Sequence, residues 1–157
     1  MNGTPQSKIV LFEVARQRFA ALLPDVVEVL RAVTIARLPK APAVIEGIIN
    51  LRGAVVPVLD IRARFGLPER AIEPTDQLVV VRAGGRVAAL HVDRTIDLVG
   101  LDRSAIQDAK DILPDPAHIS GVAKLRDGLV LIYDLQAFLT EAETDELDRA
   151  LAEITDA

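Results

Sequence analysis

Short apolar segments alternate with polar turns containing glycine or proline along most of the chain. Runs of four to eight aliphatic or β-branched residues between such turns are typical of β-strands. Residues 26–30 fit either a strand or one face of a helix. The other segments predict strands over residues 8–14, 18–23, 48–51, 55–59, 78–82, 86–92, 95–101, 121–125 and 129–134. So many short strands are typical of small β-barrels or a sandwich.

Three turns between these segments have the composition of tight hairpins. They are Arg52-Gly53, Ala83-Gly84-Gly85 and Asp127-Gly128, and glycine supplies the positive φ that such turns need. Pro57 lies inside a predicted strand and cannot donate a ladder hydrogen bond. We therefore expect that strand to lie at a sheet edge or to carry a bulge.

Helical signals are few. Pro42 followed by Gly47 predicts one helical turn over residues 42–46, and Gly66 closes a second over 61–65. Ser104 and Gln107 have capping-box spacing, which predicts a short helix through Asp108, followed by a loop over 110–118. Apolar residues recur at helical spacing from Leu135 to Ile154, which predicts one amphipathic terminal helix.

Two blocks of sequence are repeated in the same order. Residues 47–65 align with 121–139 without a gap, an offset of 74, and share six identical positions. Residues 18–22 resemble 86–90, an offset of 68. This duplication predicts two similar β subdomains, each near the size at which one core is only marginally stable. We expect them to share an interface, with a groove between them as the natural place for a partner.

The predicted organisation has three parts. Residues 1–7 form a disordered N-terminus, and residues 8–140 form one domain of two intertwined β-barrel subdomains with a boundary near 69–76. Residues 141–157 form an acidic helix or tail, with seven acidic residues against one arginine. The formal net charge of −5 therefore belongs to the tail, because the body carries 16 acidic and 17 basic residues.

Composition excludes several classes of function. The 157 residues include no cysteine, so disulfides and thiolate metal sites are excluded. A nearly neutral body with five aromatic residues lacks the basic, aromatic surface of a nucleic-acid-binding protein. No apolar run is long enough to span a bilayer, and the polar N-terminus lacks a signal core, so we expect a cytoplasmic protein without membrane insertion.

Catalytic signals are also weak. The three serines lie outside any nucleophile motif, and the two histidines, His91 and His118, lack ligand spacing. We expect no enzyme activity and no catalytic, cofactor or metal site.

One segment carries a specific resemblance. The run GIINLRG-x-VVPVLDIR-x-RFG, over residues 47–66, resembles the signature of CheW-type chemotaxis coupling proteins. The segments KIVLFEV and RFAALL, the run from Val26 to Arg31, and the last hairpin are also similar to that family. The resemblance covers about residues 8–140.

This resemblance implies a mainly β fold of two five-stranded SH3-like barrels. It also implies a non-catalytic adaptor that couples chemoreceptors (methyl-accepting chemotaxis proteins) to a CheA-type histidine kinase. In the family, the receptor's cytoplasmic tip docks between the barrels, and separate barrel ends contact the kinase regulatory domain. The protein would then lie at membrane-associated receptor arrays.

Carried over residue by residue, the resemblance gives a set of candidate partner-binding positions. Val26 and Glu28 match the V-x-E positions, while Gly47, Arg52 and Gly53 match the G-x-x-N-L-R-G motif. Val29 and Leu51 are candidate apolar contacts, although alternation along a strand leaves open which of them face inward. We also expect Glu28 and Arg52 to form an ion pair, while Arg126, the duplicate of Arg52, has no obvious acidic partner.

Other functions remain open at this stage. A CheW-like adaptor can serve a parallel pathway that controls type IV pili, development or second messengers. A small β-barrel enzyme or a nucleic-acid-binding module would need a polar pocket or a basic aromatic face.

Overall fold

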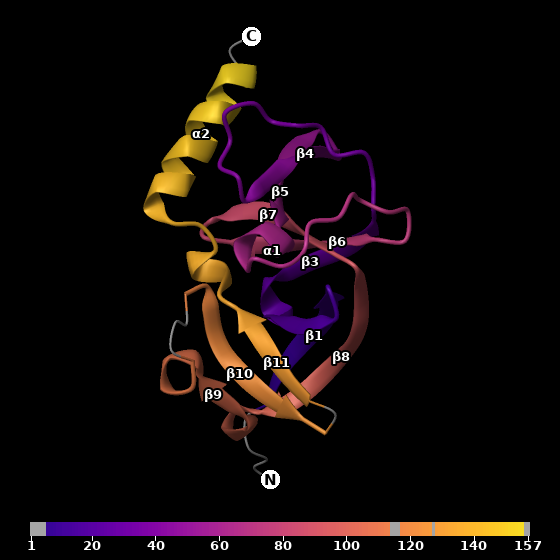
Figure 1. Cartoon of the computed structure of the whole chain (residues 1–157), viewed down its shortest axis with the longest axis vertical. Helices are drawn as coiled ribbons and strands as arrows, with labels where there is room; N and C mark the ends of the chain where they lie inside the picture. Colours follow the sequence, from indigo (N-terminus) through magenta and orange to yellow (C-terminus); the bar gives the residue numbers. More distant parts are fainter. Residues whose placement is uncertain (1–5, 114–116, 127, 156–157) are drawn as a thin grey trace.

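In the part of the chain that the structure describes, eleven strands form two sheets, and a terminal helix lies along one side (Figure 1). The computed structural model describes residues 6–113, 117–126 and 128–155. The strands are β1 (Gln6–Val14), β2 (Gln17–Leu22), β3 (Val26–Arg31), β4 (Ile45–Leu51), β5 (Ala54–Asp60), β6 (Gln77–Ala83), β7 (Arg86–Val92), β8 (Arg94–Asp102), β9 (Ile106–Asp108), β10 (Ile119–Leu125) and β11 (Gly128–Tyr133). The helices are α1 (Ile61–Arg64) and α2 (Glu141–Thr155), with 3-10 turns η1 (Leu23–Asp25), η2 (Arg103–Ala105), η3 (Ala109–Asp111) and η4 (Leu135–Ala137).

Each of the two sheets contains a hairpin from the other half of the sequence. One has five strands in the order β3-β6-β7-β5-β4, and the other has six in the order β8-β1-β2-β11-β10-β9. The hairpin β1–β2 thus joins strands from the second half of the sequence, while β6–β7 joins strands from the first. The predicted boundary at 69–76 is wrong for this reason, because that connector joins two elements of the five-stranded barrel. The chain instead passes between barrels at η1 and between β7 and β8.

The duplication is visible in the strand pairing, with one correction. Ile132 of β11 pairs with Ala20 of β2, and Val58, which aligns with Ile132 at the offset of 74, pairs with Ala89 of β7. Ala20 therefore corresponds to Ala89, an offset of 69 residues. The offset of 68 read from sequence identity is wrong by one residue, which in a strand exchanges the two faces.

Three apolar clusters hold this arrangement. One fills the five-stranded barrel and includes Val58, Leu78 and Val80, and a second fills the six-stranded barrel. The third and largest lies between the barrels. It contains all five aromatic residues of the chain, Phe12, Phe19, Phe65, Tyr133 and Phe138, although Phe65 is only partly buried. The ring centroids of Phe19 and Phe65 are 5.1 Å apart, within the range of favourable aromatic contact.

Hairpin and strand predictions are largely confirmed. The turns at Arg52-Gly53 and Gly84-Gly85 join the predicted strands, and residues 26–31 form strand β3 because they pair with β6. The similar pattern of strands in both halves agrees with the mainly β fold and its two barrels. One barrel has six strands rather than the five that were predicted, because the short strand β9 is added at the edge of its sheet.

Four local predictions are wrong. Residues 42–46 form no helical turn, since Ile45 begins β4 and pairs with Leu59 of β5. Residues 106–108 form β9 rather than a helix, because they pair with β10. The stripe from Leu135 to Ile154 is broken into η4 and α2. Gln6 and Ser7, predicted to be disordered, belong to β1, while residues 1–5 lie outside the described residues.

The prediction for Pro57 also needs correction. Strand β5 lies inside its sheet, between β7 and β4. Pro57 pairs with Ile48 of β4, but the ladder to β7 begins only at Val58. The position therefore has one paired neighbour, and the irregularity in register lies in the partner strand β4, between Ile45 and Gly47.

Gly47 makes a close backbone approach possible. A Cβ atom at this position would lie 2.3 Å from the carbonyl oxygen of Ala36. Ala36 forms an isolated bridge with Ile48, with backbone hydrogen bonds of 2.8 and 2.9 Å. At the duplicate position, Gly121, the atom nearest to an added Cβ would be the Cγ2 of Ile106, at 2.9 Å.

We expect Gly47→Ala to destabilise the protein by about 1–3 kcal/mol, because the backbone of residue 36 must move away from β4. Gly121→Ala is the matched control and should cost less, because the nearest backbone atom, the carbonyl oxygen of Gln107, would lie 3.2 Å away rather than 2.3 Å and the nearest side-chain atom is a methyl group at 2.9 Å. Denaturant unfolding of both variants measures the difference. Equal losses would contradict the account of the Ala36 contact.

Candidate functional site

A two-residue turn between β4 and β5 presents Arg52 to solvent. Both turn residues have positive φ, 52° for Arg52 and 87° for Gly53, which is the geometry of a type I′ hairpin. The side-chain oxygen of Asn50 accepts a hydrogen bond of 2.8 Å from the backbone N–H of Gly53. Leu51 and Ala54 pair directly on either side, so the turn has a fixed register.

Glu28 faces this turn from β3, the edge strand of the same sheet. A register shift between Val26 and Glu28 places Glu28 opposite Val80, whose side chain belongs to the interior of the five-stranded barrel. The shift is a β-bulge that leaves Val27 as the extra residue. Such a bulge re-aims the side chains that follow it, and the Glu28 side chain lies within hydrogen-bond distance of Arg52.

Glu28 and Arg52 form the predicted ion pair. The Arg52 Nη2 atom donates to Glu28 Oε1 at 2.9 Å, and Nη1 donates to Oε2, which gives a bidentate contact. The hydrogen bond from Arg52 lowers the pKa of Glu28, and the same contact raises the pKa of Arg52. The Arg52 side chain is 72% exposed and that of Glu28 is 22% exposed, so the pair remains accessible to a partner.

The ion pair borders an apolar groove of about 350 Å³, which we call the Glu28–Arg52 groove. Aliphatic side chains contribute most of its surface. Its lining residues are Val27, Glu28, Leu51, Arg52, Ala54, Val55, Val56, Pro57, Val80, Arg86, Val87 and Leu151. Val27, Val55 and Val87 are exposed by 41%, 53% and 38%, and together they form an apolar patch on the surface. Such patches rimmed by charges are typical of protein–protein contact sites.

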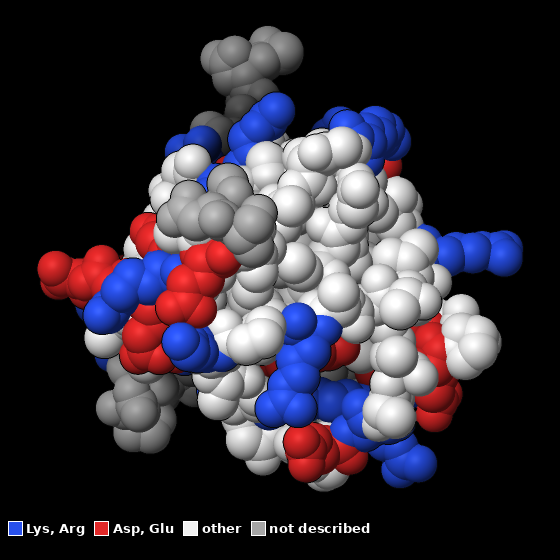
Figure 2. All heavy atoms as spheres, turned by 90° about the horizontal axis from the view of Figure 1, so that it is seen from above, with Lys and Arg blue, Asp and Glu red and all other residues white. Residues whose placement is uncertain are grey.

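The end of the molecule that lies at the top of Figure 1 is only sparsely charged at its centre. Figure 2 shows a broad uncharged face with acidic and basic side chains gathered at its margins. This distribution favours a protein partner over a polyanion, because basic side chains do not form a continuous stripe across the face.

The structure brings only part of the predicted set of residues together. Glu28, Leu51 and Arg52 line the groove, and Gly53 shapes the turn beside it. Val26 packs against the cluster between the barrels, and Val29 is exposed on β3 outside the groove. Gly47 is buried against Ala36. In this structure Gly47 therefore allows close packing of the backbone and is not part of the groove surface.

Nine of the twelve groove residues were not among the predicted contacts, and four of them show the reason. Val27 enters through the β-bulge, Arg86 and Val87 come from the start of β7, and Leu151 comes from α2. A bulge leaves no distinct mark in the sequence of β3. Arg86, Val87 and Leu151 are more than 30 positions away in sequence from the predicted contacts Glu28, Leu51 and Arg52, and only the fold brings them to the same groove.

The duplicate of this site does not repeat its chemistry. At the offset of 69 residues, Leu11 corresponds to Val80. Asp97 of β8 pairs with Leu11 and Glu28 pairs with Val80, so Asp97 occupies the position of Glu28 in the other barrel. Arg126 is the duplicate of Arg52. Among the described residues, Asp97 and Arg126 form no ion pair. The Asp97 carboxylate instead accepts a hydrogen bond from the backbone of Leu98, and Asp127, the counterpart of Gly53, lies outside the described residues.

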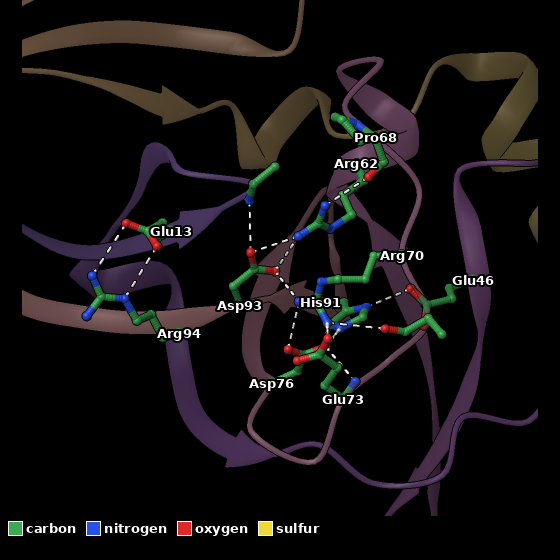
Figure 3. A network of polar contacts seen from close by, with 12 residues as sticks. Glu13, Glu46, Arg62, Pro68, Arg70, Glu73, Asp76, His91, Asp93 and Arg94 are labelled. Carbon is green, nitrogen blue, oxygen red and sulfur yellow. Dashed lines mark hydrogen bonds and ion pairs between the residues drawn. The ribbon is translucent and has the colours of Figure 1, made fainter.

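A second polar feature, a network centred on His91 and Asp93, was not predicted (Figure 3). Asp93 accepts hydrogen bonds from the guanidinium groups of Arg62 and Arg70, at 2.8 and 2.7 Å, and from the backbone N–H of Ala15 at 2.9 Å. Arg70 also pairs with Asp76 at 2.8 Å. The network therefore ties the β1–β2 turn to α1 and to the connector before β6.

His91 extends this network to β4. Its Nδ1 lies 2.8 Å from Glu46 Oε1 and its Nε2 lies 2.7 Å from Asp76 Oδ2. Carboxylates only accept, so both contacts are hydrogen bonds only when the imidazole carries both protons. Burial favours the neutral ring, but the hydrogen bonds to Glu46 and Asp76 outweigh it and raise the pKa of His91.

Within the described ranges there is no group of three or more His, Asp or Glu side chains placed to hold a metal ion. The described chain also contains no helix that is long and apolar enough to cross a membrane. Burial raises the pKa of Tyr133 to about 12, so its phenol stays protonated in the core.

Comparison with known proteins identifies related chains. The family description "CheW-like domain" matches residues 8–143. A chemotaxis protein CheW from Rhizobium meliloti is 30% identical over 142 residues, which are 88% of this chain and 90% of that protein. Protein FrzA from Myxococcus xanthus is 35% identical over 129 residues, 82% of this chain and 77% of that protein.

The fold has a close counterpart among solved structures. The crystal structure of the scaffolding protein TtCheW from Thermoanaerobacter tengcongensis superposes with a TM-score of 0.77 at 34% identity. The similarity covers 83% of this chain and 90% of that chain. It therefore includes both barrels rather than one repeat.

The His91 network makes stability depend on pH. Because the pKa of His91 is higher in the folded protein than the ordinary value of 6.5, its contribution is fully present below that value. It is lost as the pH rises through the raised pKa. The lowered pKa values of Asp76 and Asp93 act only in acid, so they add no slope in this range. The unfolding free energy should therefore fall as the pH rises above 6.5.

Chemical denaturation across this pH range measures the slope. His91→Gln should remove it, because an amide does not titrate, while His118→Gln, which changes the chain's other histidine, should retain it. A His91→Gln variant with an unchanged slope would contradict the assignment.

Proposed function

The chain belongs to the CheW-like family, and we propose that it is a non-catalytic adaptor that couples chemoreceptors to a CheA-type histidine kinase in bacterial chemotaxis. The observation that carries this proposal is the Glu28–Arg52 groove. It combines exposed aliphatic side chains with a bidentate ion pair at the edge of a rigid barrel. A surface of this kind suits recognition of another folded protein.

The kinase regulatory domain is the partner that we assign to the groove. Charged groups at the rim favour correct orientation, while the apolar centre supplies most of the affinity. The cytoplasmic tip of a receptor is the second partner, docked between the two barrels as the family resemblance implies. Both partners place the protein in the cytoplasm, at membrane-associated receptor arrays.

The chemistry of the described residues supports a role without catalysis. Both nitrogens of His91 are engaged by carboxylates inside a network that links structural elements. Asp76 and Asp93 are likewise paired with arginines. These titratable groups hold the fold together, and none of them faces the groove.

A parallel chemosensory pathway is the second candidate. It is favoured by the 35% identity to a protein named FrzA, alongside relatives named CheW. In such a pathway the same adaptor surface would serve receptors and a kinase with a different output. The genes adjacent to this one distinguish the two, because a receptor or kinase gene there names the pathway.

Charge reversal tests the assigned surface. Glu28→Arg or Arg52→Glu should each weaken binding of the kinase regulatory domain by about tenfold, because like charges then face each other at the rim. The double variant should recover part of the affinity by pairing in the reverse sense. Lys110→Glu, which alters an exposed lysine in the other barrel, is the matched control.

Titration calorimetry with the kinase regulatory domain and with a receptor tip fragment measures these affinities. A double variant that binds no better than either single variant would contradict the role of the pair. A wild-type chain that binds neither partner at tens of micromolar, the range of weak protein complexes, would overturn the adaptor function.

A further inference from the structure

The terminal helix α2 contributes to the groove through one side chain. Leu151 is half-buried and lines the same groove as Glu28, Arg52 and Val87. The sequence alone predicts the segment after residue 140 as an acidic helix or tail outside the domain. The structure makes it a wall of the candidate docking site.

The position of Leu151 is fixed by contacts along the whole helix. Thr140 and Glu143 form a reciprocal capping box, with hydrogen bonds of 2.9 and 3.1 Å. Glu143 also pairs with Arg64, whose side chain is 9% exposed, at 2.7 Å. Leu147 and Ala150 are fully buried in the cluster between the barrels. These contacts keep α2 in place, so the groove is present before a partner arrives.

The contact between Asp148 and Arg86 joins α2 to the start of β7. Arg86 and Val87 both line the groove, so this ion pair holds Leu151 beside Val87. The apolar patch is thus bordered by two ion pairs, Glu28–Arg52 on one side and Arg86–Asp148 on the other. Charged rims of this kind surround an apolar centre in many protein interfaces.

A row of acidic side chains on α2 leads along the helix towards Leu151. Glu141, Asp145 and Asp148 are spaced by four and three residues, so they lie along one face, and Leu151 continues that row. Asp148 is paired with Arg86, whereas Glu141 and Asp145 have no ion-pair partner within the described chain. Glu146 lies on a different face of the helix. The unpaired charges in this row of α2 are therefore negative, while Arg82, the cross-strand neighbour of Val87, is positive.

We propose that α2 is one wall of the kinase docking surface and that it selects a partner segment with an apolar side chain next to a lysine or arginine. The apolar side chain would pack between Leu151 and Val87, and the basic group would meet Asp145 and Glu141. This proposal rests on the adaptor function proposed above and names the helix as a determinant of which kinase regulatory domain is bound.

Matched pairs of variants test the two parts of the proposal. Leu151→Glu should weaken binding of the kinase regulatory domain about tenfold. Ile154→Glu, the same change one turn later and outside the lining of the groove, should alter it by less than about twofold. Asp145→Lys should weaken binding by about threefold at low salt and less at high salt, while Glu146→Lys should not.

The measurement is titration of the full-length variants with the kinase regulatory domain and, separately, with a receptor tip fragment. Thermal unfolding identifies any variant that is not folded. Loss of kinase binding in Leu151→Glu and Asp145→Lys, with receptor binding retained, supports the proposal. Unchanged kinase binding in both variants overturns it, while leaving the adaptor function intact if Glu28→Arg still weakens binding.

Two further results also contradict the assignment. A selective loss of receptor binding in Leu151→Glu means that the groove holds a receptor helix and not the kinase. Equal effects of Asp145→Lys and Glu146→Lys mean that only the total charge of the protein matters.

Discussion

The exchange of the β1–β2 and β6–β7 hairpins between the two barrels is the constraint on which the rest of the structure depends. Each hairpin completes the sheet of the other half of the sequence, so neither half can close a barrel alone. The aromatic residues reinforce this exchange. Phe12 and Phe19 of the exchanged hairpin stack in the cluster that Phe65 and Tyr133 complete. The chain thus concentrates its few large rings where the barrels meet.

The polar network strengthens the same crossing point and fixes the groove indirectly. Asp93 follows β7, where the chain leaves the five-stranded barrel, and it accepts a hydrogen bond from Ala15 in the exchanged hairpin. His91 and Glu46 then connect this point to β4, which continues into the Arg52 turn. α2 is attached to the cluster between the barrels and supplies Leu151 to the groove. A docking surface assembled from β3, β4, β5, β6, β7 and α2 therefore depends on the exchange for its shape.

Features that are determined by neighbouring residues could be predicted from the sequence, whereas features that depend on pairing between strands or contacts between separate elements could not. Hairpins at Arg52-Gly53 and Gly84-Gly85 were predictable because glycine and strand pattern act locally. Residues 42–46 and 106–108 were predicted wrongly because pairing with the next strand along the chain, β5 or β10, outweighed local helix signals. The repeat was visible, but identical residues at 18 and 86 hid the true offset, since sequence identity does not record which face a side chain occupies. The Glu28–Arg52 pair was predicted from a motif, whereas Leu151 and the His91 network come from positions that only the fold joins.

Hydrogen–deuterium exchange of the full chain, with and without the kinase regulatory domain, tests most directly whether the groove is a docking surface built from both ends of the sequence. The account predicts added protection in β3, in the β4–β5 turn and in the second half of α2 together. Protection confined to the six-stranded barrel, or binding without protection at either β3 or α2, would contradict it.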